Sequence, residues 1–129
     1  MPDTSEHTVD SIGVTYRTRS ATEDEICSHL VSCNEDFITP LDQRVNIKEY
    51  ASKLSRAAVT FEAWSGHILV GLVAAYFNDL KSRSGYITTV SIVNKFKGMG
   101  ISSELLRACV SYAGAHNFRE IRLEVHKDN

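Results

Sequence analysis

The chain has 129 residues, of which 43% are hydrophobic and 23% charged, and its formal net charge is -2. This length and composition predict one globular domain with its own core. The nearly neutral charge, without a run of basic residues, excludes nucleic acid and anionic membranes as expected partners. The longest apolar stretch, 68–77, contains Gly71 and is too short to span a bilayer. Because the first ten residues are polar rather than signal-like, we expect a cytoplasmic protein.

The cysteines give a second compositional constraint. Cys27, Cys33 and Cys109 are odd in number and fall at apolar positions of expected helices. This arrangement predicts reduced thiols in the core rather than a disulfide or a metal site. We therefore expect no metal.

The first half of the chain predicts one strand followed by two helices. Residues 1–13 show little periodicity and are expected to form a flexible arm. Residues 14–19 alternate between outward and inward positions, as in a strand with one buried face. Thr22 and Glu25 form a capping-box signature for the first helix, whose apolar positions recur as far as Phe37. A second helical pattern begins near Asn46, with Ile47, Tyr50, Leu54 and Ala57 on one apolar face.

The middle of the chain predicts two strands joined by a hairpin. Residues 58–64 alternate, and Ser65 and Gly66 are typical of a hairpin turn. The apolar residues 68–77 predict a central strand that is buried on both faces. Residues 78–85 are polar and predict a loop.

A strand predicted over 86–93 leads into a basic, glycine-containing junction before an amphipathic helix over 101–115. The first turn of a helix exposes backbone N–H groups without partners, and the helix dipole adds positive charge, so this junction favours a phosphate or pyrophosphate. An ordinary glycine turn is the alternative. The expected anion-binding residues are Lys97, Gly98, Met99, Gly100, Ile101, Ser102 and Ser103.

The last predicted element is a strand over 120–126. Because it follows a helical crossover, it should pair in parallel with the strand over 86–93. The pattern predicts a single domain over residues 14–129 that mixes helices with a sheet. Its order is strand, helix, helix, strand, strand, strand, helix, strand.

This order and the glycine junction resemble the GCN5-related N-acetyltransferase (GNAT) superfamily over about residues 14–129. The family's signature is Gln or Arg, two residues, Gly, one residue, then Gly or Ala. Here it falls on Lys97, Gly100 and Ser102, with conservative departures at both ends. The resemblance implies an α/β (α+β) fold with a GNAT-like mixed central sheet flanked by helices. Further matching features are Gly71, the strand residues Val90, Ser91 and Ile92, the run Leu123, Glu124 and Val125, and Asn129.

The resemblance implies acetyl-coenzyme A (acetyl-CoA) as the acetyl donor. The pyrophosphate of coenzyme A suits the N–H groups of residues 98–103, and its pantetheine arm is expected to pair with the backbone of Val90 and Ile92, on either side of Ser91. Asn129 matches an asparagine that touches the cofactor in the family. The acceptor is a small-molecule amine or a protein amino group, and the sequence does not choose between them.

Direct transfer requires a neutral amine, a polarised thioester carbonyl and a proton for the departing thiolate. Glu124 is the first candidate for the base, because some family members use a glutamate at this position. An exposed glutamate paired with Arg122 or Lys127 is the alternative. His126 is a second candidate, since its ordinary pKa is near neutrality. The oxyanion is expected to meet a backbone N–H group at Ile92.

Thr88 and Thr89 stand where other family members often place an acid, so a water held by hydroxyl groups is a further alternative. The family normally continues after its asparagine with a helix that carries a tyrosine acid and with two closing strands. None of the tyrosines matches that position: Tyr16, Tyr50, Tyr76, Tyr86 and Tyr112.

Three explanations of this difference stay open. The chain is a piece of a longer protein, truncated at its C-terminus, or another chain completes the site, or the chain binds coenzyme A or a partner without turnover. A sheet that ends at the fifth strand leaves an unpaired edge, so self-association through that edge is expected.

Overall fold

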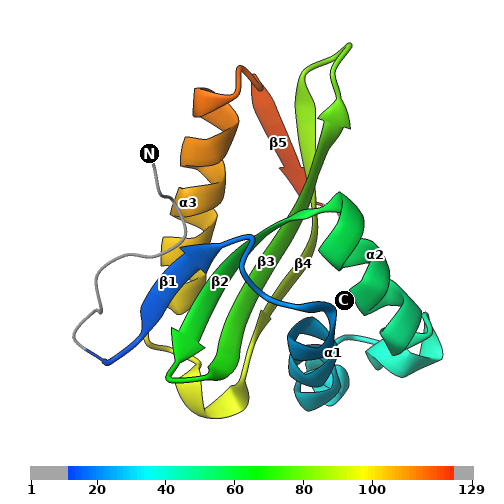
Figure 1. Ribbon diagram of the computed structural model, residues 1–129, viewed down its shortest axis with the longest axis vertical. Helices are drawn as coiled ribbons and strands as arrows, with labels where there is room; N and C mark the ends of the chain where they lie inside the picture. The colour runs from blue at the N-terminus through cyan, green and yellow to red at the C-terminus, as the bar shows by residue number, and fades with distance from the viewer. Residues whose placement is uncertain (1–11, 124–129) are drawn as a thin grey trace.

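The computed structural model describes residues 12–123, which form a five-stranded sheet with three α-helices (Figure 1). Most of the arm predicted over 1–13 lies outside the described residues. No described helix is long and apolar enough to cross a membrane. With η marking short 3-10 helices, the elements are β1 (Thr15–Thr18), α1 (Glu23–Ser32), η1 (Asn34–Asp36), η2 (Leu41–Gln43), α2 (Ile47–Ala57), β2 (Val59–Ser65), β3 (Ile68–Asp79), β4 (Ser84–Ile92), η3 (Asn94–Phe96), α3 (Ile101–Ala115) and β5 (Glu120–Leu123).

The strands follow one another across the sheet in chain order, β1-β2-β3-β4-β5. Neighbouring strands are antiparallel except β4 and β5, which are parallel. The central place of β3 and the parallel pairing of the last strand are both as predicted. The predicted α+β fold with a mixed sheet is therefore confirmed.

The hairpin between β3 and β4 is longer than predicted. A loop was expected over 78–85, but Asp79 pairs with Ser84, so that the connection is only 80–83. Although Ser84 is polar, it is buried, and its place in the ladder outweighs its sequence preference for a loop. The turn between β2 and β3 lies at residues 66–67, one residue after the predicted position.

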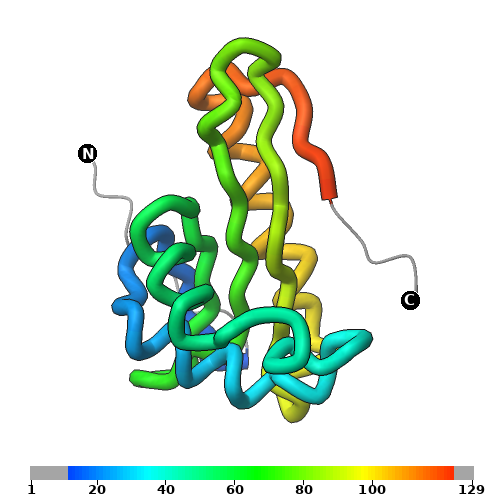
Figure 2. The backbone as a smooth tube through the Cα atoms, turned by 90° about the vertical axis from the view of Figure 1, so that its right-hand side faces the viewer, coloured from blue at the N-terminus to red at the C-terminus, as the bar shows by residue number. Residues whose placement is uncertain are grey.

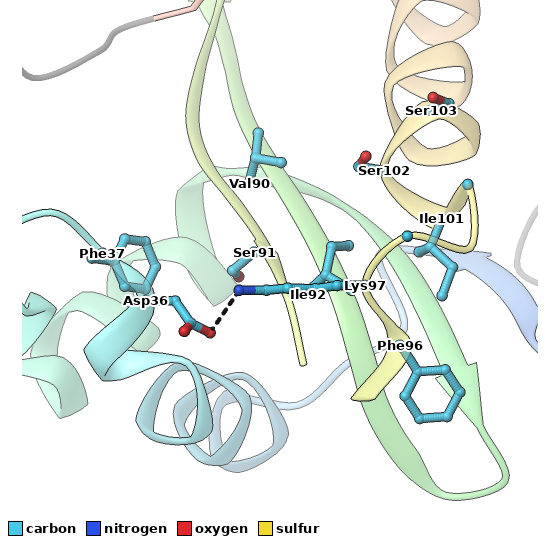
Figure 3. Close-up of a pocket in the computed structure, with 12 residues that line it drawn as sticks. Asp36, Phe37, Val90, Ser91, Ile92, Phe96, Lys97, Ile101, Ser102 and Ser103 are labelled. Atoms are coloured by element: carbon cyan, nitrogen blue, oxygen red, sulfur yellow. Dashed lines mark ion pairs between the residues drawn. The ribbon is translucent and has the colours of Figure 1, made fainter. Parts of the chain in front are cut away.

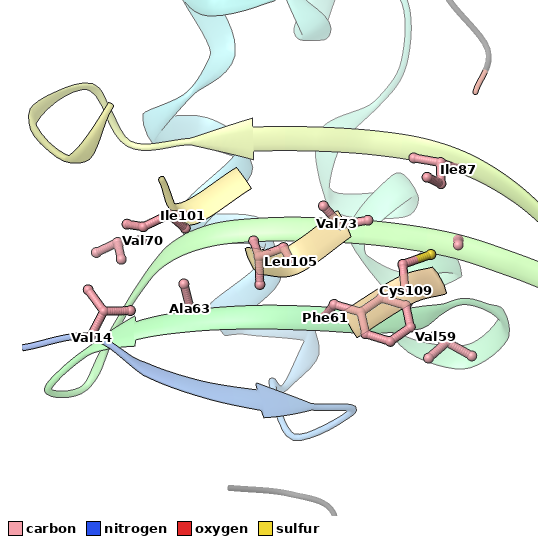
Figure 4. Close-up of a cluster of buried hydrophobic side chains, with 11 residues drawn as sticks. Val14, Val59, Phe61, Ala63, Val70, Val73, Ile87, Ile101, Leu105 and Cys109 are labelled. Atoms are coloured by element: carbon pink, nitrogen blue, oxygen red, sulfur yellow. The ribbon is translucent and has the colours of Figure 1, made fainter. Parts of the chain in front are cut away.

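Two apolar layers cover the two faces of the sheet. Figures 1 and 2 show α1 and α2 on one face and α3 on the other. The layer beneath α3 is drawn in Figure 4; its buried residues are Val14, Val59, Phe61, Ala63, Val70, Val73, Ala75, Ile87, Ile101, Leu105 and Cys109. The layer beneath α1 and α2 consists of Ile26, Leu30, Leu41, Ala51, Leu54, Ala58, Trp64, Leu69, Leu72 and Ala74.

Both helices on the second face start at the predicted caps. The hydroxyl of Thr22 accepts from the N–H of Glu25, whose side chain accepts from the N–H of Thr22. The side chain of Asn46 accepts from the N–H of Glu49 at the start of α2. These local contacts satisfy N–H groups that the helices leave unpaired.

The first helix is shorter than its apolar pattern, which continues to Phe37. It ends at Ser32, and the chain turns through η1 instead. The side chain of Asn34 stabilises this turn by accepting from the N–H of Asp42 at 2.8 Å. As a result, Asp36 and Phe37 leave the helix and reach the end of β4.

A buried carboxylate joins β2 to the start of α1. Glu62 is 0% exposed and accepts five hydrogen bonds of 2.6–3.1 Å. Burying a carboxylate is costly unless donors surround it, and here they do. The donors are the N–H and hydroxyl of Ser20, the N–H of Ala21, the hydroxyl of Thr60 and the indole N–H of Trp64.

A buried histidine joins α1 to β3 and β4. His29 is 2% exposed, and its Nδ1 lies 2.9 Å from the carbonyl oxygen of Leu69. Since a carbonyl only accepts, Nδ1 carries the proton, and Nε2 accepts from the hydroxyl of Ser91 at 2.8 Å. Burial lowers the pKa of His29, so the imidazole is neutral at pH 7.

Gly71 on β3 lets α3 approach the sheet closely. A Cβ atom at this position would lie 2.9 Å from Cγ2 of Ile101, 3.1 Å from Cδ1 of Ile92 and 3.2 Å from Cβ of Ala63. These separations are shorter than normal carbon contacts. The first residue of α3 therefore packs directly on the backbone of the central strand.

We expect Gly71→Ala to destabilise the fold by about 1–3 kcal/mol, because a methyl group overpacks this contact. Urea unfolding measures the change. Gly114→Ala in α3 is the matched control: no atom lies within 4 Å of its Cβ position, and alanine is the better helix former, so its free energy of unfolding should not fall. A Gly71→Ala variant as stable as the wild type would contradict the close approach.

Stability should fall as the pH drops through about 6.5, because the unfolded state then protonates His29 while the folded state, with its lowered pKa, does not. Above that pH His29 is neutral in both states, so its burial adds no pH dependence to the stability. Urea titrations at pH 7.5 and 5.5 should show a lower free energy of unfolding at pH 5.5, and His29→Asn should remove this difference. His67→Asn, at an exposed position, is the control and should keep the fall in stability between the two pH values. The same fall in His29→Asn as in the wild type would show that buried His29 does not cause it.

Candidate functional site

The predicted anion-binding junction is a loop of residues 97–100, here called the glycine loop. Gly98 and Gly100 have φ angles of 79° and 83°, in the left-handed region that glycine favours. Gly100 is the N-cap of α3 and offers no side chain to the helix. The first N–H groups of α3 are therefore left open for a ligand.

A cavity of about 550 Å³ lies between the glycine loop, the end of β4 and the turn at η1 (Figure 3). No atom lies within 4 Å of the Cβ positions of Gly98 and Gly100, so the glycines leave open space on this side. Met99 does not line the cavity and is half exposed. The lining residues are Asp36, Phe37, Val90, Ser91, Ile92, Phe96, Lys97, Gly98, Gly100, Ile101, Ser102 and Ser103.

The cavity thus brings together most of the residues predicted for the cofactor. Ser102 and Ser103 lie on the first turn of α3, and Val90 and Ile92 line the β4 side (Figure 3). Asn129, predicted to touch the cofactor, and Glu124, the predicted base, lie outside the described residues.

An ion pair crosses the cavity. Nζ of Lys97 lies 3.3 Å from Oδ2 of Asp36, and Figure 3 shows the lysine side chain extending toward Asp36 of η1. Both side chains are partly exposed, so the pair is screened by solvent and is weak. Lys97 is therefore able to exchange Asp36 for a ligand phosphate at low cost.

The hydroxyl of Ser91 is turned toward α1, where it donates to His29. Cys33 lies beside this pair, with Sγ 3.8 Å from Nε2 of His29. Burial raises the pKa of Cys33 to about 11, with Asp36 adding to the rise, so the thiol stays protonated and is a poor nucleophile. This buried group fixes the inner wall of the cavity to α1. His29 was not predicted, because its partners lie 40 and 62 residues away in sequence.

Next along β4, away from the glycine loop, lie Tyr50, Thr88 and Thr89, here called the hydroxyl cluster. Oη of Tyr50 is 2.6 Å from Oγ1 of Thr89, 2.9 Å from Oγ1 of Thr88 and 3.5 Å from the carbonyl oxygen of Thr88. The β3–β4 pairing shifts register here, since Ala74 faces Thr89 while Ala75 faces Ile87. Thr88 is therefore the extra residue of a β-bulge.

The pairing between β4 and β5 is described from Ser84 and Glu120 to Ile87 and Leu123. In residues 12–123, no strand pairs with β4 on this side beyond Ile87. Nη2 of Arg122 lies 3.1 Å from Oε2 of Glu120 on the same strand.

Comparison with known proteins extends these observations. A model of the acetyltransferase (GNAT) family matches residues 23–129, which is most of the chain. A search of curated proteins found no match. Many solved structures, by contrast, share this fold.

One is a ribosomal-protein-alanine N-acetyltransferase from Brucella melitensis biovar Abortus 2308, with a TM-score of 0.68, 19% identity, and 88% of this chain and 81% of that chain covered. An aminoglycoside acetyltransferase from an uncultured soil metagenomic sample has a TM-score of 0.66 and 17% identity, with 92% of this chain and 82% of that chain covered. A Clostridium acetobutylicum protein described as a predicted acetyltransferase and solved with acetyl-CoA has a TM-score of 0.65 and 20% identity, with 88% of this chain and 82% of that chain covered. These likenesses concern the fold, and together with the family match they lead to one conclusion: the chain belongs to the acetyltransferase (GNAT) family.

Proposed function

We propose that this chain binds acetyl-CoA in the cavity and transfers the acetyl group directly to a primary amine. The observation that carries the proposal is the open start of α3, where unpaired N–H groups and two side-chain-free positions face a cavity of about 550 Å³. A pyrophosphate fits this chemistry, because it is anionic and accepts several hydrogen bonds. The family membership supplies the reaction class.

The direction of the cofactor follows from the same arrangement. With its pyrophosphate at the glycine loop, the pantetheine arm runs along β4 past Ile92 and Val90 and pairs with the strand backbone, as an added strand does. The acyl end then points away from the loop, toward Thr88. A rise of about 3.3 Å per residue gives roughly 13 Å from Ile92 to Thr88, a suitable length for an extended arm.

In this proposal, the backbone of Ile92 pairs with the pantetheine arm and Asn129 contacts the cofactor. The oxyanion, which was expected from the sequence at the N–H group of Ile92, forms farther along β4, beside the acyl end near Thr88. Glu124 accepts the proton of the attacking amine, which is the role for which a carboxylate near the cofactor is suited. The acceptor is a small-molecule amine or a protein amino group. A screen of aminoglycosides, polyamines and peptides with free amino termini, with thiol release as the readout, separates transfer from binding without turnover.

Gly100→Val should abolish binding of coenzyme A, because its side chain fills the open space and forces a strained backbone angle. Isothermal titration calorimetry measures the affinity. Gly66→Val in the hairpin between β2 and β3 is the matched control: its φ is 60° and its Cβ position is equally open, but it does not line the cavity. It should share the strain and keep the affinity. Unchanged affinity in Gly100→Val would show that the site is elsewhere.

The two partners of the ion pair should act in opposite directions on coenzyme A binding. Lys97→Ala should weaken it by about 1–2 kcal/mol, since a charge-assisted contact to phosphate is lost. Asp36→Asn should strengthen it by less than about 1 kcal/mol, since Lys97 is released from its partner. Lys95→Ala, on η3 but not lining the cavity, is the control for net charge. Calorimetry at two salt concentrations tests the three variants; a loss of affinity in Asp36→Asn would contradict the exchange.

A further inference from the structure

The hydroxyl cluster has the geometry of a proton-transfer site. Two threonine hydroxyl groups of β4 lie within hydrogen-bond distance of the phenol oxygen of Tyr50 on α2, and in each pair either oxygen can be the donor. Thr89 is 3% exposed, whereas Tyr50 and Thr88 are half-buried and therefore accessible. A buried hydroxyl thus holds the phenol of a side chain that is itself only half-buried.

The cluster also lies at the place where the reaction is expected. This step rests on the proposed function, which directs the acyl end of the cofactor along β4 from Ile92 toward Thr88. The bulge at Thr88 interrupts the ladder there and re-aims its side chain, as bulges beside active sites do.

A second tyrosine near the cluster shows how different the environment of Tyr50 is. Oη of Tyr76 is buried without a hydrogen-bond partner among the described residues. Burial raises the pKa of Tyr76, and Tyr50 adds to the rise. Nζ of Lys53 lies 5.5 Å from its ring centre. Tyr76 is therefore a neutral phenol that has no partner to exchange a proton with, while Tyr50 has two.

We propose that Tyr50 donates the proton that the departing coenzyme A thiolate requires, with Thr88 and Thr89 as positioning residues. The amine nitrogen forms a bond to the acetyl carbon, and the carbon–sulfur bond breaks with its electron pair moving to sulfur. The sulfur takes the proton of Tyr50, and the phenol oxygen takes a proton from the Thr88 hydroxyl. That hydroxyl recovers its proton from a water molecule. The hydroxide left by this water is neutralised by the proton that the amine loses and Glu124 passes on to solvent.

A purely structural Tyr50 would tie α2 to β4 and nothing more. Loss of the hydroxyl would then change stability without affecting the sulfur. A proton donor, in contrast, acts on the sulfur whether or not a reaction takes place, because it donates a hydrogen bond to a bound thiolate. The two roles are separated by one kinetic and one equilibrium measurement.

The kinetic measurement uses hydroxylamine as the acceptor, because it is neutral at pH 7 and needs no base, so that departure of the thiolate is isolated. We expect Tyr50→Phe to lower kcat for thiol release from acetyl-CoA about a hundredfold, with its calorimetric affinity for coenzyme A unchanged. Tyr76→Phe removes a hydroxyl without partners and should keep the wild-type kcat. An unchanged kcat in Tyr50→Phe, or equal losses in both variants, would overturn the proposal.

The equilibrium measurement follows the thiol of bound coenzyme A by its ultraviolet absorbance as the pH is raised, with the desulfo-coenzyme A complex as the blank. A hydrogen bond from Tyr50 favours the thiolate, so Tyr50→Phe should raise the pKa of the bound thiol by about one unit. Tyr76→Phe should leave it unchanged. An unchanged pKa of the bound thiol in Tyr50→Phe would overturn the role of Tyr50 as proton donor. Failure of the wild type and of every variant to bind coenzyme A would instead refute the proposed function.

Discussion

The missing side chain at Gly71 sets the distance between α3 and the sheet. Ile101, the first residue of α3, is 1% exposed and packs where a Cβ atom would stand. The open N–H groups of the helix start are therefore fixed next to the end of β4 rather than out in solvent. A side chain at Gly71 would move the helix start and with it the glycine loop, because Gly100 of the loop is the N-cap of the helix. The geometry of the candidate anion site is thus determined by a packing contact in the core.

On the opposite face of the sheet, buried hydrogen bonds fix the positions of α1 and α2 along the strands, which apolar packing alone does not. Apolar side chains hold α1 and α2 against the sheet but tolerate sliding, whereas hydrogen bonds are directional. Glu62 fixes the start of α1, His29 fixes its middle to Ser91, and Tyr50 fixes α2 to the bulge of β4. All these contacts end on neighbouring strands of one sheet. The wall of the cavity that carries Asp36 is therefore held in register with β4.

Local signals in the sequence predicted the elements, and contacts between distant residues decided the rest. The limits of α3, the two helix caps and the central strand follow from periodicity and capping chemistry within a few residues. The charge of Lys97 was predictable, but its partner Asp36 was not, because the turn at η1 brings it there against the apolar helical pattern. Tyr50 was placed on an apolar helix face, and nothing near it in sequence indicates that its hydroxyl reaches Thr88 and Thr89, 38 and 39 residues away.

The two ends of the β4 edge differ in their chemistry, and this difference divides binding from transfer. The glycine-loop end carries charges that are exposed and exchangeable, which suits a ligand that arrives with its own negative charge. The bulge end carries neutral hydroxyls held by a buried threonine. In the proposed function, a neutral amine and a thioester lose little solvation there, while a thiolate formed there is stabilised by a hydrogen bond. On that proposal, the glycine loop governs affinity for coenzyme A, and discrimination between acceptor amines depends on the surface around Tyr50 and Thr88.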